Sequence, residues 1–327
     1  MDTYPISSNS LEKHYHINGR HFGQQYKEHL SGFNDWEQKT HAKEWILFSD
    51  NIGEYLSIDE TALSNGELYT ILTNKEAKGK KGALVAMIKG TKSDVIIDIL
   101  RKIPKQRRDK VKEITLDMAG TMNRIVSSCF RKAKKVIDRF HVQKLAFDAL
   151  QEIRIKHRWE AIDEENDAIN EARWQKVSYI PATFPNGDTK KQLLARSRYL
   201  LFKSPDKWTE KQKERSKILF AQYPDIKEAF SLTHKLRLIF CQCKNKGVAL
   251  TRLAHWYDEV EKSGFSSFNT ITATIYTHYN DILNFFENRS TNASAESFNA
   301  KLKAFRATMR GVTDIEFFLF RVAKIYA

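Results

Sequence analysis

The sequence predicts an α/β fold: a mixed five-stranded sheet with flanking helices, interrupted by a large all-helical insertion. Three observations predict it. Three consecutive β-rich segments are separated by turns, two later β-rich segments alternate with helical periodicity, and a long stretch shows no strand pattern. The 327 residues, 41% of them hydrophobic, suffice for a sizeable core and for more than one structural unit.

The strand order follows from the connections. β-formers dominate the segments 55–59, 68–73, 83–88, 114–117 and 136–138. Asn65-Gly66 predicts a hairpin turn between the first two strands, and a helix from Ser93 to Pro104 follows the third. Three antiparallel neighbours followed by right-handed β-α-β crossovers give the order of a ribonuclease H-like sheet.

The domain organisation follows from where strand patterns stop. We expect a short N-terminal helical region over 1–52, the first part of the core over 53–144, a helical insertion over 145–285, and C-terminal helices over 286–327 that complete the core. The insertion contains Trp159, Trp174, Trp208 and Trp256, which we expect in its core rather than as base-stacking platforms.

The charge balance favours a polyanionic partner. The formal net charge is +14 and the pI is about 9.5, so nucleic acid is the first candidate, and a solvated basic surface is the alternative. The three cysteines form no C-x-x-C pair, which argues against a zinc site or a disulfide framework. No stretch is apolar enough for a signal peptide or a membrane span, so a soluble intracellular setting is expected.

Acidic residues stand at the predicted carboxyl ends of three strands. Asp59, Asp117 and Asp138 each close a strand, and parallel pairing of the first and fourth strands would bring Asp59 beside Asp117. Two adjacent carboxylates repel one another unless a cation lies between them, and Mg²⁺ suits such hard oxygen ligands. The alternative is that each aspartate caps the following helix or turn. Glu60 should point to the opposite face of its strand, as a supporting or surface residue.

A third acidic residue begins a late helix. Glu296 falls near the start of a helix that begins at Asn292 or Ser294, with Asn299 and Lys303 at helical spacing. This combination suits a metal ion beside a phosphodiester, although the helix dipole alone also favours an acid there. The basic residues that follow could hold phosphates or form a solvated face: Lys301, Lys303, Arg306 and Arg310.

Five ordered blocks resemble the ISL-three family of insertion-sequence transposases. They begin with Leu56-Ser57-Ile58-Asp59-Glu60-Thr61 and Thr115-Leu116-Asp117-Met118-Ala119, and continue with 136–145, 198–210 and 282–303. The resemblance runs from about residue 53 to the C-terminus and implies a DDE transposase that cuts and joins DNA with divalent metal. It assigns the catalytic, metal-binding triad to Asp59, Asp117 and Glu296.

The resemblance sets further expectations about cofactors and partners. It implies two Mg²⁺ or Mn²⁺ ions, double-stranded transposon-end and target DNA, a homo-oligomer on DNA, and a cytoplasmic, nucleoid-associated protein. Family members usually carry a zinc-binding and helix-turn-helix region first, whereas residues 1–52 contain no cysteine. We therefore expect the catalytic half of a split transposase with a separately encoded recognition subunit. A nuclease or resolvase without strand joining, or a non-catalytic DNA-binding descendant, are the alternatives.

Three residues are expected to support the triad. Asp138 and His141 belong to the family-like block, where Asp138 could orient a neighbouring group or cap a helix, and a structural role is favoured. Asn299 lies one helical turn beyond Glu296.

Overall fold

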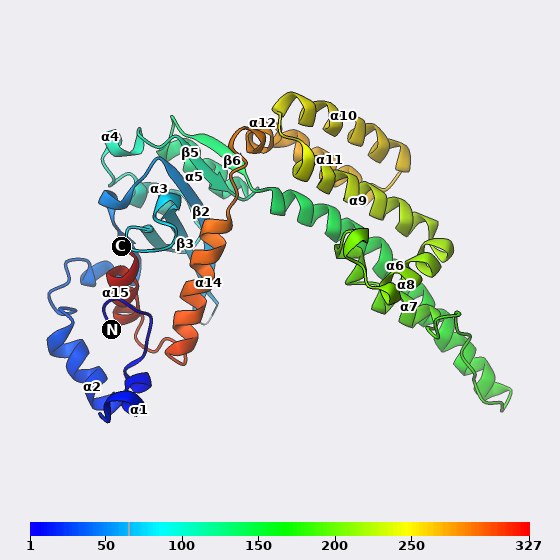
Figure 1. The fold of residues 1–327 in the computed structure, drawn as a ribbon, viewed down its shortest axis with the longest axis horizontal. Helices are drawn as coiled ribbons and strands as arrows, with labels where there is room; N and C mark the ends of the chain where they lie inside the picture. The colour runs from blue at the N-terminus through cyan, green and yellow to red at the C-terminus, as the bar shows by residue number, and fades with distance from the viewer. Residues whose placement is uncertain (65) are drawn as a thin grey trace. The chain divides into compact units, whose positions relative to one another are not determined.

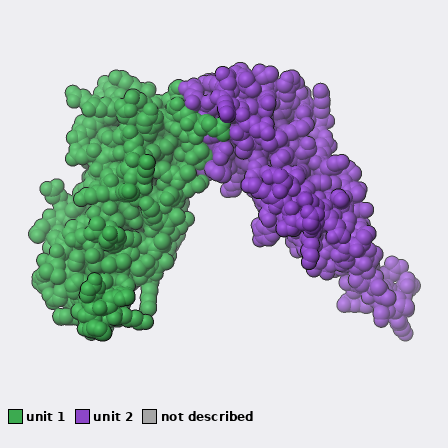
Figure 2. Space-filling view, in the orientation of Figure 1, with its two compact units in different colours: residues 1–138, 288–327 green, residues 139–287 purple. Residues whose placement is uncertain are grey.

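The computed structural model describes residues 1–64 and 66–327, so Asn65 of the predicted hairpin turn lies outside the described residues. The chain divides into two compact units, residues 1–138 with 288–327 and residues 139–287 (Figure 2). The first unit is therefore assembled from two separate stretches of sequence, and the second unit is the stretch between them.

The described part of the first unit holds a mixed six-stranded sheet, so the prediction of five strands is wrong (Figure 1). In order across the sheet the strands are β1 (Trp45–Leu47), β4 (Leu84–Lys89), β3 (Glu67–Asn74), β2 (Tyr55–Ser64), β5 (Glu113–Leu116) and β6 (Lys134–Ile137). The first four are antiparallel to their neighbours, and β5 and β6 continue the sheet in parallel with β2. The unexpected strand is β1, whose three residues are held by pairing with β4, which lies about forty positions further along the chain.

Strand β2 is longer than predicted. It continues to Ser64, so Asp59 lies within the strand and not at its carboxyl end. The pairing partners explain the difference. Pairing with β5 is registered as far as Ser57 opposite Thr115, whereas pairing with β3 continues to Ser64 opposite Glu67.

Two apolar cores cover the two faces of the sheet. On one face, Leu56, Ile58 and Ile114 belong to a core that also contains buried residues of α3 (Ser93–Leu100) and α5 (Gly120–Cys129). On the other face, the core includes residues of α14 (Ala293–Thr308) and α15 (Ile315–Tyr326). Side chains alternate along a strand, so Leu56 and Ile58 turn toward α3 and α5 while Asp59 turns toward α14.

The remaining described elements of the first unit are short. They are η1 (Ser8–Leu11), α1 (Glu12–Tyr15), α2 (Gly19–Gln25), η2 (Tyr26–Leu30), η3 (Lys39–His41), η4 (Ser49–Asn51), η5 (Lys75–Ala77) and α4 (Lys105–Arg108). The fully buried Arg321 of α15 holds the first residues in place, because its Nη2 donates to the carbonyl oxygens of Met1, Tyr4 and Ile6 at 2.7, 3.2 and 3.2 Å.

The second unit contains helices and no strand among its described residues. Its elements are α6 (Arg139–Trp174), α7 (Lys190–Arg196), η6 (Leu200–Phe202), η7 (Pro205–Lys207), α8 (Glu210–Gln222), α9 (Pro224–Gln242), α10 (Lys246–Ser263), α11 (Ser266–Thr277), α12 (Tyr279–Leu283) and the start of α13 (Phe285–Asn288). Trp256 is buried as expected, but Trp159 and Trp174 are 61% and 84% exposed, so their predicted core positions are wrong. None of the described helices of either unit combines the length and apolar character needed to cross a bilayer.

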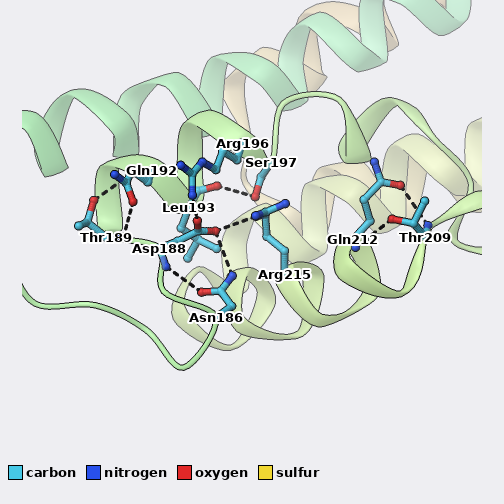
Figure 3. A network of polar contacts seen from close by, with 10 residues as sticks. All are labelled: Asn186, Asp188, Thr189, Gln192, Leu193, Arg196, Ser197, Thr209, Gln212 and Arg215. Carbon is cyan, nitrogen blue, oxygen red and sulfur yellow. Dashed lines mark hydrogen bonds and ion pairs between the residues drawn. The ribbon is translucent and has the colours of Figure 1, made fainter.

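A buried aspartate ties together three segments of the second unit (Figure 3). Asp188 is fully buried, forms an ion pair with Arg196 of α7, and accepts Nε of Arg215 of α8 at 2.7 Å. Its carboxylate also accepts Nδ2 of Asn186 at 3.0 Å. Burial raises the pKa of this carboxyl, but the hydrogen bonds and charges of Arg215 and Arg196 outweigh burial, so the pKa lies below its usual value.

We predict that Asp188→Asn lowers the free energy of unfolding by about 2–3 kcal/mol at pH 7, because two charge-assisted contacts are lost in a buried site. A folded-state pKa below the unfolded one stabilises the protein above the unfolded value of about 4, and this contribution is lost as the pH falls through the folded value. Denaturant titrations of both proteins between pH 7 and pH 3 check this, with the exposed Asp258→Asn as the matched control. A difference from wild type that widens below about pH 4 would contradict the assignment.

Candidate active site

Three aspartates fall in one row across the parallel strands. Ser57 of β2 is level with Thr115 of β5, so Asp59 and Asp117, each two residues further on, continue at the same level. Leu116 of β5 is level with Ile137 of β6, so Asp117 and Asp138 also match. Neighbouring strands lie about 4.8 Å apart, and residues at one level of parallel strands share a face. Continued past the last paired residues, this register places the three aspartates in one row on the α14 side of the sheet.

The carboxylates of Asp59 and Asp117 are both oriented by hydrogen bonds. Asp59 accepts the backbone N–H of Glu60 at 2.9 Å through Oδ1 and Nδ2 of Asn299 at 2.8 Å through Oδ2. Asp117 accepts the backbone N–H of Ala119 at 2.8 Å, in the turn that leads into α5. Both aspartates are half-buried, so each keeps access to solvent while its orientation is restricted.

Glu60 lies in the electric field of the two aspartates. Burial raises the pKa of its carboxyl, and the negative charges of Asp117 and Asp59 raise it further. Strand alternation assigned Glu60 to the opposite face, as a supporting or surface residue. The sequence signal that Glu60 belongs near the site is its position directly after Asp59. Two consecutive acids concentrate negative charge in one place, whichever way each side chain points.

Helix α14 is fastened to the row of aspartates at two points. The backbone N–H of Asn292, its N-cap residue, donates to Oδ2 of Asp138 at 2.9 Å. About two helical turns further along α14, Nδ2 of Asn299 donates to Oδ2 of Asp59. Glu296 lies between these two points, near the start of the helix, and is exposed. The helix that carries the third predicted acid therefore contacts Asp59 of β2 and Asp138, the residue that follows β6.

The acidic side chains near the row do not form a preformed metal-binding site. Among residues 1–64 and 66–327, no three carboxylate, imidazole or thiol side chains converge as a metal-binding group. One orphaned atom nevertheless lies at the site: Oδ1 of Asn299, a residue only 7% exposed, is buried without a hydrogen-bond partner.

The predicted phosphate-binding residues differ in their surroundings. Nζ of Lys301 donates to the carbonyl oxygen of Gly79 at 2.7 Å, a contact that links α14 to the turn before β4. Lys303 and Arg310 are exposed, and Arg306 is half-buried. His141 is half-buried in the first turn of α6, in the second unit.

A cavity of about 970 Å³ opens elsewhere in the first unit. It is lined by residues near both chain ends and by Lys80, Lys81, Lys301 and Lys324. Asp59, Asp117 and Glu296 are not among its lining residues, so it is separate from the row of carboxylates.

The family of the chain follows from comparison with models of known protein families. The chain matches no curated protein and no solved structure. A family model described as a transposase, that of the ISL-three type of DDE transposase, matches residues 56–322. This range begins in β2 and ends in α15, and it includes Asp59, Asp117 and Glu296. Since the match covers most of its length, the chain belongs to the ISL-three family of DDE transposases.

Proposed function

We propose that this protein catalyses metal-dependent DNA strand cleavage and strand transfer, with Asp59, Asp117 and Glu296 as the metal-binding triad. The observation that carries the proposal is the attachment of α14 to Asp138 and Asp59 at either end of a row that has Asp117 in its middle. Family membership supports the general reaction, and this attachment supports the choice of residues.

The spacing along α14 fits the spacing across the sheet. From Asn292 to Asn299 a helix rises about 10 Å. From β6 across β5 to β2 is two strand spacings, also about 10 Å. Glu296 comes four residues after one anchor and three before the other, which favours a position near the end of β5. We propose that its exposed side chain turns toward Asp117 when metal is bound.

The donor set fits Mg²⁺ or Mn²⁺. Carboxylate oxygens of Asp59, Asp117 and Glu296 are the hard ligands these ions prefer. Burial is the main cause of the raised pKa of Glu60, and the charges of Asp117 and Asp59, which a cation would offset, raise it further. Two bound ions would supply activation of a water or a 3′-hydroxyl and stabilisation of the leaving oxygen. The buried Oδ1 of Asn299 gives a further oxygen at the same place.

The chain's own residues prepare this site. Asn299 holds one oxygen of Asp59, and the backbone N–H of Ala119 holds one oxygen of Asp117, so both carboxylates are oriented in advance. The exposed Glu296 stands on the solvent side, where a DNA phosphate would approach. The exposed Lys303 and Arg310 follow on the same helix and its end, and would hold neighbouring phosphates.

We also propose that the first unit is a ribonuclease H-like catalytic core. The strand order β4-β3-β2-β5-β6, with two parallel strands after three antiparallel ones, supports this, and β1 is an additional edge strand. The core is interrupted between Asp138 and Asn288, where the chain forms the helical second unit. The second unit would then be an insertion placed directly before the helix that carries Glu296.

We predict that Asp59→Asn, Asp117→Asn and Glu296→Gln each reduce strand cleavage by about 10³-fold or more, because each removes a negative metal ligand worth several kcal/mol of transition-state stabilisation. The assay is nicking and joining of a plasmid that carries the gene with its flanking DNA, in MgCl₂ or MnCl₂. Thermal melts of each variant show whether it remains folded.

Asp98→Asn on α3 and Glu261→Gln on α10 are matched controls, since both are exposed and lie on elements outside the row. They should retain wild-type cleavage. Near-normal cleavage by a triad variant would remove that residue from the triad. Cleavage by wild type without any joined product would favour a nuclease or resolvase.

We further predict that the 327-residue chain binds duplex DNA strongly but with little sequence discrimination, because its +14 charge acts through phosphates. Fluorescence anisotropy with terminal-repeat and scrambled duplexes at several salt concentrations measures both properties. Lys303→Ala should lower the salt slope by about one, whereas Lys301→Ala should change it less because that amine is bound to Gly79. A preference for the terminal repeat by orders of magnitude would contradict the prediction. It would also remove the reason to expect a separate recognition subunit.

A further inference from the structure

Two buried acids receive the chain where it returns from the second unit. Asn288 Nδ2 donates to Oε2 of Glu113 at 3.0 Å, and the backbone N–H of Asn292 donates to Oδ2 of Asp138 at 2.9 Å. Glu113 is 2% exposed and Asp138 is fully buried. Between these contacts run the few residues that link the second unit to α14.

A half-buried lysine accompanies the two acids. Nζ of Lys75 lies 3.6 Å from Oε1 of Glu113 and donates to Oγ1 of Thr115 at 2.6 Å. Burial lowers the pKa of Lys75, while the negative charges of Glu113 and Asp138 act in the opposite direction. Buried charges are tolerated when they are paired and hydrogen-bonded. The polar cluster therefore holds the returning chain with compensated charge.

Asp138 does for α14 what a local capping residue does elsewhere. Asn292 is the N-cap of α14, but its side chain makes no capping hydrogen bond, and both of its polar atoms are buried without a partner. In a capping box, the side chain three residues into the helix accepts the N–H of the N-cap residue. In α14 that position is Ala295, whose side chain has no acceptor. The N–H of Asn292 donates instead to Asp138, the residue directly after β6. Its negative charge also suits the positive end of the helix dipole.

We propose that Glu113 and Asp138 form a re-entry clamp that sets the axial position of α14, and that Asp138 is a positioning residue for Glu296. This inference rests on the proposed function of Glu296. The clamp gives the three aspartates at one level different roles. Asp59 and Asp117 bind metal, and Asp138 accepts the N–H at the start of α14. An amide carbonyl oxygen at position 138 would accept the N–H of Asn292 almost as well as a carboxylate oxygen does. A metal ligand at position 138 would instead require the negative charge of the carboxylate.

The test compares Asp138→Asn with Asp138→Ala in the full chain. Asp138→Asn keeps an oxygen acceptor for the N–H of Asn292 and should retain cleavage within about tenfold of wild type. Asp138→Ala removes the acceptor and should reduce kcat at least a hundredfold, with little change in KM for DNA. Paramagnetic titration with Mn²⁺ alone should show weaker binding to Asp138→Ala than to Asp138→Asn.

Hydrogen exchange measures the clamp without reference to activity. In Asp138→Ala the amides of residues 288–296 should exchange at least tenfold faster, while those of β2 and β5 stay as in wild type. Asn288 is exposed, so replacing it leaves the core intact, and Asn288→Ala should accelerate amide exchange in the same segment a few-fold. It serves as the test if Asp138→Ala does not fold.

Two outcomes would overturn the proposal. One is unchanged exchange of residues 288–296 in Asp138→Ala, or in Asn288→Ala where the first variant is unfolded. The other is loss of cleavage and Mn²⁺ binding in Asp138→Asn with normal exchange, which would make Asp138 a metal ligand. A wild-type chain that cleaves no DNA would instead refute the proposed function, and the exchange data would still decide whether the clamp exists.

Discussion

The register of three parallel strands is the constraint on which the rest of the first unit depends. It places Asp59, Asp117 and Asp138 at one level on one face of the sheet, with neighbours in the row about one strand spacing apart. Neighbouring carboxylates repel one another, and each of the three accepts a hydrogen bond from a different donor. Asp59 accepts from the Asn299 side chain, Asp117 from the Ala119 N–H and Asp138 from the Asn292 N–H. A shift of one residue in any strand would turn its aspartate to the opposite face.

Helix α14 obtains its rotation and its axial position from different interactions. Phe298, Leu302 and Phe305 are buried in the core they share with the sheet and α15, and this packing fixes which side of the helix faces the strands. Apolar packing is non-directional, so it tolerates sliding along the axis better than hydrogen bonds do. The hydrogen bonds to Asp138 and Asp59 resist that sliding. Precision in the placement of Glu296 therefore depends on polar contacts at the strand ends.

Sequence patterns predicted the parts of this structure that are set locally. Alternation and turns predicted five of the six strands, and the positions of Asp117 and Asp138 directly after β5 and β6 followed from them. Strand β1 was missed because three residues carry no periodicity, and the exposure of Trp159 and Trp174 was missed because residue type does not reveal whether a neighbouring helix covers it. The bond between Asp138 and Asn292 joins positions 154 residues apart, a link that no local pattern encodes.

The charges on α14 change sign along one side of the helix, and this matters for how DNA could reach the site. Glu296, Asn299, Lys303 and Arg306 follow one another at intervals of three or four residues, so they form one stripe. The stripe begins with an acid near the row of aspartates and ends with cations about 10–15 Å away. A phosphate is attracted by the far end and repelled by the near end until cations neutralise the carboxylates. This ordering would let the backbone of a duplex bind first through Lys303 and Arg306, and would make close approach of a phosphate to Asp59 and Asp117 depend on bound metal.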